Sequence, residues 1–277
     1  MHINVISSLP SPSKAVLISP LKIGPQVNVG RKEEALLNPK LTQRGSLPTA
    51  AIQQSLLFSD FSNPECATII SAARQKRFLK KQTIFFDGDP VQQVVLLLTG
   101  SAKMTQFGST GTEVILRLSR SGDVLGGLGN SLKDRQCCTA ETLEDCCVMV
   151  WESASFGSLT DRFPLLRRNV LRILEERLRD MEERFRELST ENVASRVSSQ
   201  LVRLANQIGK QHAEGVQVNL SQQELAQLTG TTLFTVSRLL SRWKKEGTVT
   251  TRREAVSIRS IPALAAISTK DESSTLW

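Results

Sequence analysis

The chain has 277 residues, of which 40% are hydrophobic and 22% are charged, and its formal net charge is +8. This length suffices for about two domains, each with its own core. No apolar run approaches the roughly 20 residues of a membrane span, and no signal peptide is recognisable, so we expect a cytoplasmic protein without a membrane partner. Two histidines and no tyrosine leave few groups for acid–base chemistry, which argues against an enzyme. Five cysteines, four of them in adjacent pairs, lack the spacing of a secreted disulfide framework.

Two regions of different character make up the first part of the chain. Residues 1–50 carry scattered proline, serine and glycine without a sustained hydrophobic period, which is typical of a disordered arm. Between residues 51 and 160, short apolar runs alternate with turn signals at residues 87–90, 99–100 and 121–123. Short runs between glycine turns predict an antiparallel β domain.

A long helix is predicted for residues 161–191, with Pro164 in its first turn. Apolar residues recur there at alternating intervals of three and four, a period of 3.5 that forms a narrow seam for a second helix. Val170 and Ile173 widen the seam at its start, as in a helix that lies on its own domain. We therefore expect the first turns to rest on the β domain and the later turns to pair with a second copy of the chain. The predicted dimer interface consists of Leu171, Leu174, Leu178, Met181, Phe185 and Leu188.

The pattern of a winged helix-turn-helix occupies residues 192–262, where positive charge is concentrated, and residues 263–277 follow as a C-terminal tail. Ser221 and Glu224 form the pattern of a capping box, and Gly230 predicts the turn to a second helix that Thr231 or Thr232 can cap. Residues 248–258 alternate like the hairpin of a wing. A basic surface can simply be solvated, but together with a helix-turn-helix it favours a polyanion.

Three stretches, residues 87–104, 121–129 and 220–240, resemble the CRP/FNR superfamily of bacterial transcription regulators, and the likeness covers residues 51–260. The resemblance implies an α+β fold. An N-terminal antiparallel β-roll, the jelly roll of cyclic-nucleotide-binding domains, is followed by a long dimerisation helix and a C-terminal winged helix-turn-helix. It also implies a homodimer that binds palindromic sites in double-stranded DNA and works with RNA polymerase.

The resemblance is incomplete at the sensor. Members that bind cyclic AMP carry a glutamate for the ribose where this chain has Gly127, and an arginine–serine pair where this chain has Arg135 without a following serine. We therefore expect that the roll has lost cyclic-nucleotide binding and that its effector is unknown. The first 60 residues contain no cysteine for an iron–sulfur cluster, and both histidines lie outside the roll, so no cofactor is expected. The remaining candidates for an effector pocket are Gly126, Leu128, Met181 and Glu182.

A different sensor is possible at Cys137, Cys138, Cys146 and Cys147. If residues 139–145 form a hairpin, the two pairs face each other and could sense redox state or bind a metal. Adjacent residues on a strand point to opposite faces, however, so each face offers only one pair. Buried cysteine that packs as a small apolar residue is the commoner role.

The second helix of the motif departs from the family at its first turn. Many members carry arginine and glutamate there and a later arginine, whereas this chain has Leu233, Phe234 and the later Arg238. We expect Arg238 to contact guanine and the two apolar side chains to meet thymine methyl groups. The alternative is that Phe234 packs between the two helices, and a dimeric small-ligand module without specific DNA readout is the other possible function. Further candidates for DNA contact are Ser221, Gln222, Thr231, Thr232, Thr235, Ser237 and Arg252.

Overall fold

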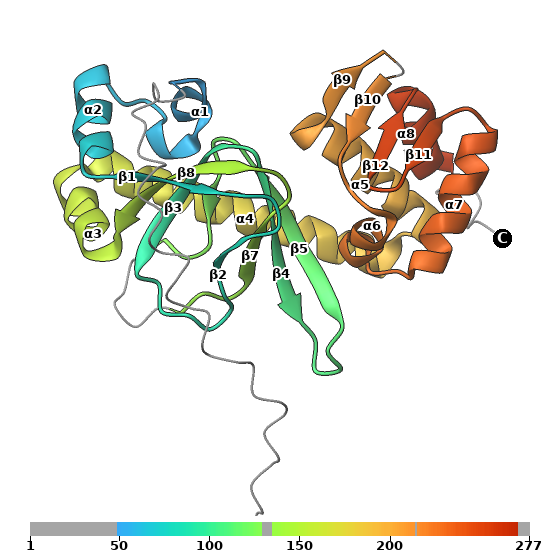
Figure 1. The fold of residues 1–277 in the computed structure, drawn as a ribbon, viewed down its shortest axis with the longest axis horizontal. Coiled ribbons are helices and arrows are strands. Elements are labelled where there is room, and N and C mark those ends of the chain that lie inside the picture. Colours follow the sequence, from blue (N-terminus) through green and yellow to red (C-terminus); the bar gives the residue numbers. More distant parts are fainter. Residues whose placement is uncertain (1–48, 129–134, 214, 271–277) are drawn as a thin grey trace, which may run out of the picture. The chain divides into compact units, whose positions relative to one another are not determined.

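The structure is a computed structural model that describes residues 49–128, 135–213 and 215–270 (Figure 1). The predicted arm, residues 1–50, lies outside this part except for its last two residues. Three helical elements precede the first strand: α1 (Thr49–Gln54), the 3-10 helix η4 (Leu56–Phe58) and α2 (Asn63–Ser71). The β domain predicted from residue 51 therefore begins later, at Arg74. The local reason is a capping box between Ser62 and Glu65 with Pro64 in the first turn, which starts a helix.

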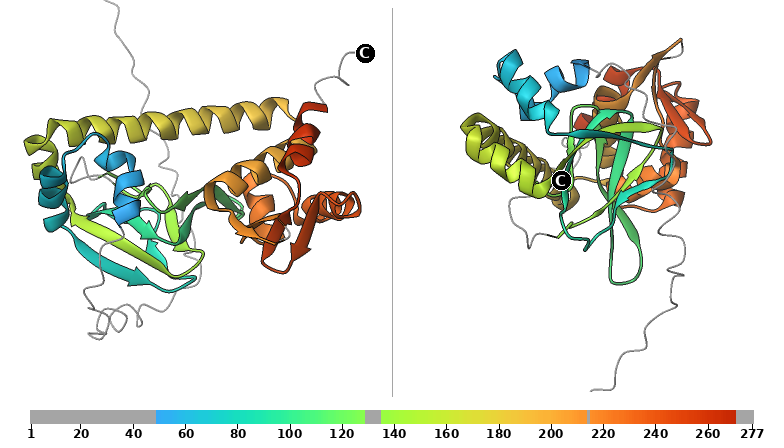
Figure 2. Two further views of the ribbon diagram at one scale, coloured as in Figure 1. Left: turned by 90° about the horizontal axis from the view of Figure 1, so that it is seen from above. Right: turned by 60° about the vertical axis from the view of Figure 1, so that its left-hand side comes forward.

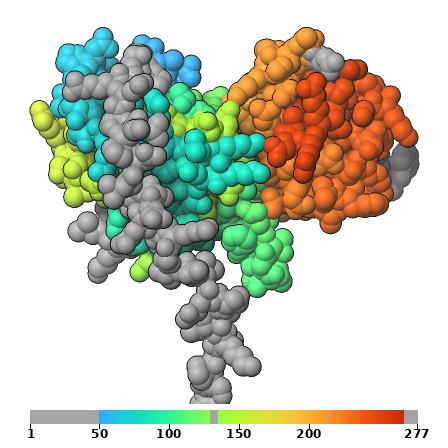
Figure 3. All heavy atoms as spheres, in the orientation of Figure 1, coloured from blue at the N-terminus to red at the C-terminus, as the bar shows by residue number. Residues whose placement is uncertain are grey.

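The roll consists of two antiparallel sheets with strand orders β1-β8-β3-β6 and β2-β7-β4-β5. Strand β3 alternates between two cores: Val95 and Leu97 pack between the sheets, whereas Val94, Leu96 and Leu98 pack against the helices. The β4–β5 hairpin, green in Figure 3, stands out from the rest of the roll. The strands are β1 (Arg74–Phe78), β2 (Thr83–Phe85), β3 (Gln93–Thr99), β4 (Ser101–Phe107), β5 (Glu113–Arg120), β6 (Val124–Leu125), β7 (Thr139–Thr142) and β8 (Cys146–Glu152).

Two helices follow the roll, α3 (Ser153–Arg162) and α4 (Pro164–Thr190), and α4 is a single long helix (Figure 2). Pro164 lies in its first turn, as predicted. Val170 and Ile173 are buried against the roll in the cluster that contains Trp151. The prediction that the first turns of this helix rest on the β domain is therefore confirmed. No helix in the described part of the chain is long and apolar enough to cross a membrane.

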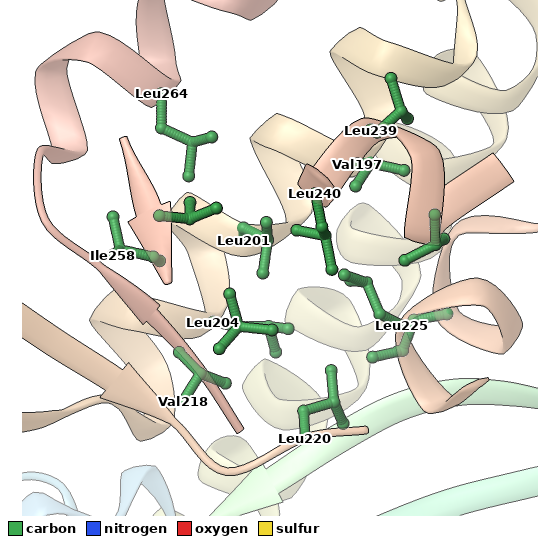
Figure 4. Packing of buried hydrophobic residues seen from close by; sticks show 14 of the residues in the cluster. Val197, Leu201, Leu204, Val218, Leu220, Leu225, Leu239, Leu240, Ile258 and Leu264 are labelled. Atoms are coloured by element: carbon green, nitrogen blue, oxygen red, sulfur yellow. The ribbon is translucent and has the colours of Figure 1, made fainter. Parts of the chain in front are cut away.

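The remaining elements form the winged helix-turn-helix around a core that includes Val197, Leu201 and Leu240 (Figure 4). The wing is present as β11 and β12, and the strand order of its sheet is β11-β12-β10-β9. The α+β fold is confirmed. The elements are α5 (Val193–Ile208), β9 (Lys210–His212), β10 (Gly215–Val218), α6 (Gln222–Thr229), α7 (Leu233–Lys245), β11 (Val249–Arg252), β12 (Ala255–Ile258) and α8 (Ile261–Lys270).

Two elements of this domain were not predicted from the sequence. The β9–β10 hairpin was not predicted, because Lys210, Gln211 and His212 are all exposed and give no alternation of apolar and polar residues. The tail predicted for residues 263–277 is helical up to Lys270, and its Leu264 is fully buried in the core. This helix has a proline at its second position, followed by a short apolar run. The helix forms because Leu264 packs against the core of the domain.

Candidate nucleic-acid interface and sensor pocket

Helices α6 and α7 form the helix-turn-helix, and local hydrogen bonds define their ends. The backbone N–H of Glu224 donates to the Ser221 hydroxyl at 3.1 Å, and the Glu224 carboxylate accepts from the Ser221 N–H at 2.8 Å. Gly230 ends α6 with φ of 61°, a left-handed conformation that suits glycine. The Thr232 hydroxyl accepts from the backbone N–H of Thr235 at 3.2 Å and caps α7. The predicted capping box, glycine turn and threonine cap are thus confirmed.

The first turn of α7 presents apolar side chains to solvent. Leu233 is 46% exposed and Phe234 is 75% exposed, whereas Trp243 at the other end of the helix is fully buried. The buried face packs on α5 and α6, where Figure 4 shows Leu239 and Leu240 among the core side chains. Phe234 does not pack between the two helices, so that alternative is wrong. Arg238 is also exposed, one helical turn after Phe234.

The other candidate DNA-contacting residues differ in the hydrogen bonds and the solvent exposure of their side chains. The Ser221 hydroxyl is held by Glu224, and the Thr235 hydroxyl lies 2.9 Å from that of Thr232. Thr232 is exposed, and the side chains of Gln222, Thr231, Thr235 and Ser237 are half-buried.

The wing carries charges of both signs. Arg252 is exposed at the end of β11, and Arg253 is exposed in the turn that follows. Glu254 in the same turn accepts from the Lys80 ammonium at 2.9 Å. Both side chains of this pair are about half exposed, so solvent screens it.

The seam of α4 is a row of apolar side chains open to solvent. Their exposed fractions are 54% for Leu171, 40% for Leu174, 58% for Leu178, 68% for Met181, 73% for Phe185 and 52% for Leu188. Contiguous apolar exposure of this kind marks an interaction surface. The opposite side of the helix differs, since Leu166, Val170 and Ile173 are buried against the roll.

The space directly beside Gly126 and Gly127 in the roll is occupied by neighbouring side chains. Gln136 is buried and accepts from the Gly127 N–H at 2.9 Å. A Cβ atom at Gly126 would lie 2.4 Å from both Gln136 Oε1 and Phe85 Cζ, and one at Gly127 would lie 2.7 Å from Val91. There is accordingly no room beside Gly127 for the glutamate that cyclic-AMP-binding relatives carry.

The other residues predicted for an effector pocket do not gather there. Arg135 points to the turn before β3 and donates to the Gly88 carbonyl oxygen at 2.7 Å. Leu128 is 5% exposed and packs in the apolar core. Met181 and Glu182 are exposed on α4.

Sequence reasoning missed Arg177, the α4 side chain that reaches this region. Its Nη1 donates to the Gly126 carbonyl oxygen at 2.8 Å, and its Nη2 donates to that of Val124. Arg117 on β5 is the second residue missed. An arginine inside the apolar run of residues 114–118 was the signal that could have found it.

The four roll cysteines do not form the facing pairs that the alternative sensor would require. Residues 139–142 pair with β2 and β4, whereas β8 pairs with β1 and β3, so the strands flanking the turn belong to different sheets. Burial raises the pKa of the Cys138 thiol to about 12 and that of Cys146 to about 11. No group of three or more potential metal ligands is present in the described part of the chain. The hypothesis of a redox- or metal-responsive cluster at Cys137, Cys138, Cys146 and Cys147 therefore loses its geometric basis.

Comparison with known protein families gives two matches. The model of the Crp-like helix-turn-helix domain matches residues 195–267, and that of the cyclic nucleotide-binding domain matches residues 75–163. The chain is 25% identical over 210 residues to the CRP-like cAMP-activated global transcriptional regulator of Mycobacterium tuberculosis, covering 74% of this chain and 94% of the relative. It is 27% identical over 213 residues to the cyclic AMP receptor protein of Thermus thermophilus, covering 77% and 96%.

Solved structures share the fold. The c-di-GMP-responsive global regulator CLP of Xanthomonas campestris superposes with a TM-score of 0.64 at 20% identity, over 72% of this chain and all of that one. A transcriptional regulator of the CRP family from Thermus thermophilus superposes with a TM-score of 0.62 at 24% identity, over 70% of this chain and 96% of that one.

Proposed function

Because the chain belongs to the CRP/FNR superfamily of bacterial transcription regulators, we propose that it acts as a homodimer that binds palindromic sites in double-stranded DNA. The observation that carries the proposal is the exposed first turn of α7, a helix whose other face is locked into the core. We expect no catalytic activity. RNA polymerase is the further partner that the family implies.

Direct readout of DNA would come from α7 in the major groove. Arg238 is exposed and has the planar fork that donates two hydrogen bonds to guanine O6 and N7. Leu233 and Phe234 cannot donate hydrogen bonds through their side chains, but they match the methyl group of thymine. Ser221, Gln222, Thr231 and Thr235 are then placed to contact phosphates, and Arg252 would do so from the wing.

The exposed seam on α4 would hold the dimer. Apolar side chains at alternating intervals of three and four favour a two-stranded coiled coil, because each knob inserts into a hole on the partner helix. A two-fold axis along this seam would bring the two α7 helices to half-sites about 34 Å apart. A palindromic DNA sequence has the same two-fold symmetry as such a dimer.

The signal for this regulator would not be a cyclic nucleotide. Gly127 offers no acceptor for a ribose hydroxyl, and the Arg135 guanidinium is bound to the Gly88 carbonyl oxygen. Val91 occupies the space beside Gly127 instead, and Gln136 accepts a hydrogen bond from the Gly127 N–H. Charge-assisted hydrogen bonds contribute roughly 1.5–3 kcal/mol each, so the loss of several removes useful affinity.

Selection of bound sequences from a random duplex library tests the proposal, with the molar mass of the protein measured by analytical ultracentrifugation. We expect a dimer and an enriched palindrome, with binding that weakens steeply as salt rises but keeps a sequence-specific part. A protein that enriches no sequence at any salt concentration would instead be a ligand-binding module without specific DNA readout.

A further inference from the structure

Arg184 lies near the end of α4 and joins three elements of the fold. Its Nη2 donates to the carbonyl oxygen of Leu228 on α6 at 2.8 Å and to that of Ile115 on β5 at 3.3 Å. Leu228 belongs to the last turn of α6, where backbone carbonyl oxygens lack donors from within the helix. A cation at the C-terminus of a helix is also favoured by the helix dipole. One guanidinium group therefore connects the long helix, the roll and the first helix of the helix-turn-helix.

The surroundings of Arg184 enclose its guanidinium group. Burial lowers the pKa of Arg184, the charge of Arg203 lowers it further, and the Glu187 carboxylate opposes both effects. Glu187 is 7% exposed and forms an ion pair with Arg203 on α5. Arg184 and Glu187 line one small recess together with Leu228 and Thr229. Hydrogen bonds in such an enclosed place are stronger than bonds in water, so those of Arg184 hold α4 firmly against α6.

Strand β5 and helix α6 are also in direct contact with each other. Ile115 on β5 is fully buried among the core residues of the winged helix-turn-helix. Gln227 on α6 donates from Nε2 to the Glu113 carboxylate on β5 at 2.9 Å. Lys103 forms an ion pair with the same carboxylate at 3.7 Å. The loss of the Arg184 hydrogen bonds would therefore loosen this contact without removing it.

The orientation of α7 follows that of α6. Gly230 and the Thr232 cap set the turn between the two helices, and both helices contribute to one core. The exposed apolar seam of α4 reaches the turn that carries Arg184, because Phe185 is the next residue and is 73% exposed. The connection from the seam to the exposed first turn of α7 therefore includes the hydrogen bonds of Arg184.

We propose that Arg184 is a positioning residue that determines which spacing of two DNA half-sites the dimer accepts. The inference rests on the proposed function, in which two α7 helices bind a palindrome. Each base pair inserted between the half-sites moves one of them by about 3.4 Å along the DNA and turns it by about 35° around the axis. A helix-turn-helix held on α4 by directional hydrogen bonds cannot follow this movement. Without the bonds of Arg184, the remaining apolar contacts are not directional, and the motif can shift with the half-site.

Binding of the full chain to duplexes that share their half-sites and differ in the spacer tests this inference. The palindrome that the wild type selects is the reference, and the spacer is lengthened or shortened by one or two base pairs. We expect the wild type to bind the reference at least about tenfold more tightly than any altered spacer, because a displaced half-site loses base contacts. In Arg184→Met this difference should shrink to about threefold or less, with unchanged affinity for a duplex that carries a single half-site. A variant that is merely destabilised would lose affinity for the single half-site as well.

Two variants separate the hydrogen bonds of Arg184 from its charge and its place on the helix. Both bonds come from one nitrogen, Nη2, so the ammonium nitrogen of lysine can replace it, and Arg184→Lys should keep the spacer preference of the wild type. Arg186→Met is the matched control and should also behave like the wild type, because Arg186 lies on the same helix but is exposed and pairs with Glu183.

The outcomes distinguish this inference from the function on which it rests. A wild type that selects no palindrome would overturn the proposed function and the role of Arg184 with it. A wild type that selects a palindrome, with equally sharp spacer discrimination in Arg184→Met, would overturn the role of Arg184 alone. An equal loss of discrimination in Arg186→Met would do the same. Arg184→Gln, whose side chain is shorter, replaces Arg184→Met if methionine disturbs the fold.

Discussion

Replacing Phe234 by alanine should change which DNA sequence is bound while leaving the domain folded. The side chain is 75% exposed, and Val236, Leu239 and Trp243 make the core contacts of the same helix. Surface substitutions away from special features usually change the free energy of unfolding by no more than about 0.5 kcal/mol. Phe234→Ala should stay within that range.

The effect on DNA binding can be bounded from the same exposure. Burying a phenylalanine side chain completely contributes about 1.5–3 kcal/mol. Since 75% of Phe234 is still open to solvent, docking it against a thymine methyl group can contribute about 1–2 kcal/mol at most. That corresponds to roughly 5- to 30-fold in affinity. The loss should be confined to sites with thymine at the contacted step, because other bases lack the methyl group.

Two measurements on Phe234→Ala and on a control variant separate these effects. Chemical unfolding gives the stability, and selection from a random duplex library gives the base preference at each position. Leu239→Ala is the control, because Leu239 is 7% exposed and its truncation should cost about 2–5 kcal/mol. The reasoning is refuted if Phe234→Ala is destabilised as strongly as Leu239→Ala, or if it selects the same sequences as the wild type.

Four further predictions follow from the site and the roll. Arg238→Ala should cost about 1–3 kcal/mol of binding free energy and relax one guanine per half-site, whereas an unchanged selected sequence would remove Arg238 from base readout. Changing Leu178 and Phe185 together to glutamate should give monomers in sedimentation with weak, nonspecific binding, and full palindrome affinity in a monomer would contradict the dimer. Calorimetry at millimolar cyclic AMP or cyclic GMP should show no saturable heat, and micromolar binding would contradict the loss of the nucleotide site. Burial raises the pKa of the Cys146 thiol to about 11 in the folded protein, whereas the unfolded thiol ionises near pH 9. The contribution of this thiol to the free energy of unfolding is therefore present below pH 9 and lost by about pH 11. Urea unfolding at pH 8 and pH 11 should show a smaller decline for Cys146→Ala than for the wild type, and equal declines would exclude this thiol as the cause.

The helix-turn-helix could be predicted from sequence because its signals are local. The capping box of Ser221 and Glu224, the turn at Gly230 and the cap at Thr232 each involve residues within a few positions of one another. The exposure of Phe234 could not be predicted in the same way, because an apolar side chain in a first turn fits either a core or a binding surface. Only the packing of the other α7 residues against α5 and α6 decides between them.

The sequence predicts that the roll lacks the residues that bind a cyclic nucleotide. It does not predict which side chains occupy the space beside Gly126. Gly127 and the missing arginine–serine pair are visible in the sequence as departures from a family pattern. Gln136 and Phe85 fill the space beside Gly126. Their positions depend on the pairing of strands that are distant in sequence. The hairpin on which the alternative cysteine sensor depended is absent for the same reason. Strands on either side of a short turn usually pair, but here they enter different sheets.

The contacts of the α4 arginines could not be predicted from the sequence, because these side chains bind backbone carbonyl oxygens. Sequence reasoning finds partners through complementary side chains, such as a carboxylate for each arginine. Arg177 instead donates to the carbonyl oxygens of Val124 and Gly126, and Arg184 donates to that of Leu228 at 2.8 Å and to that of Ile115 at 3.3 Å. Every residue has a carbonyl group, so no pattern of residue types records such a contact.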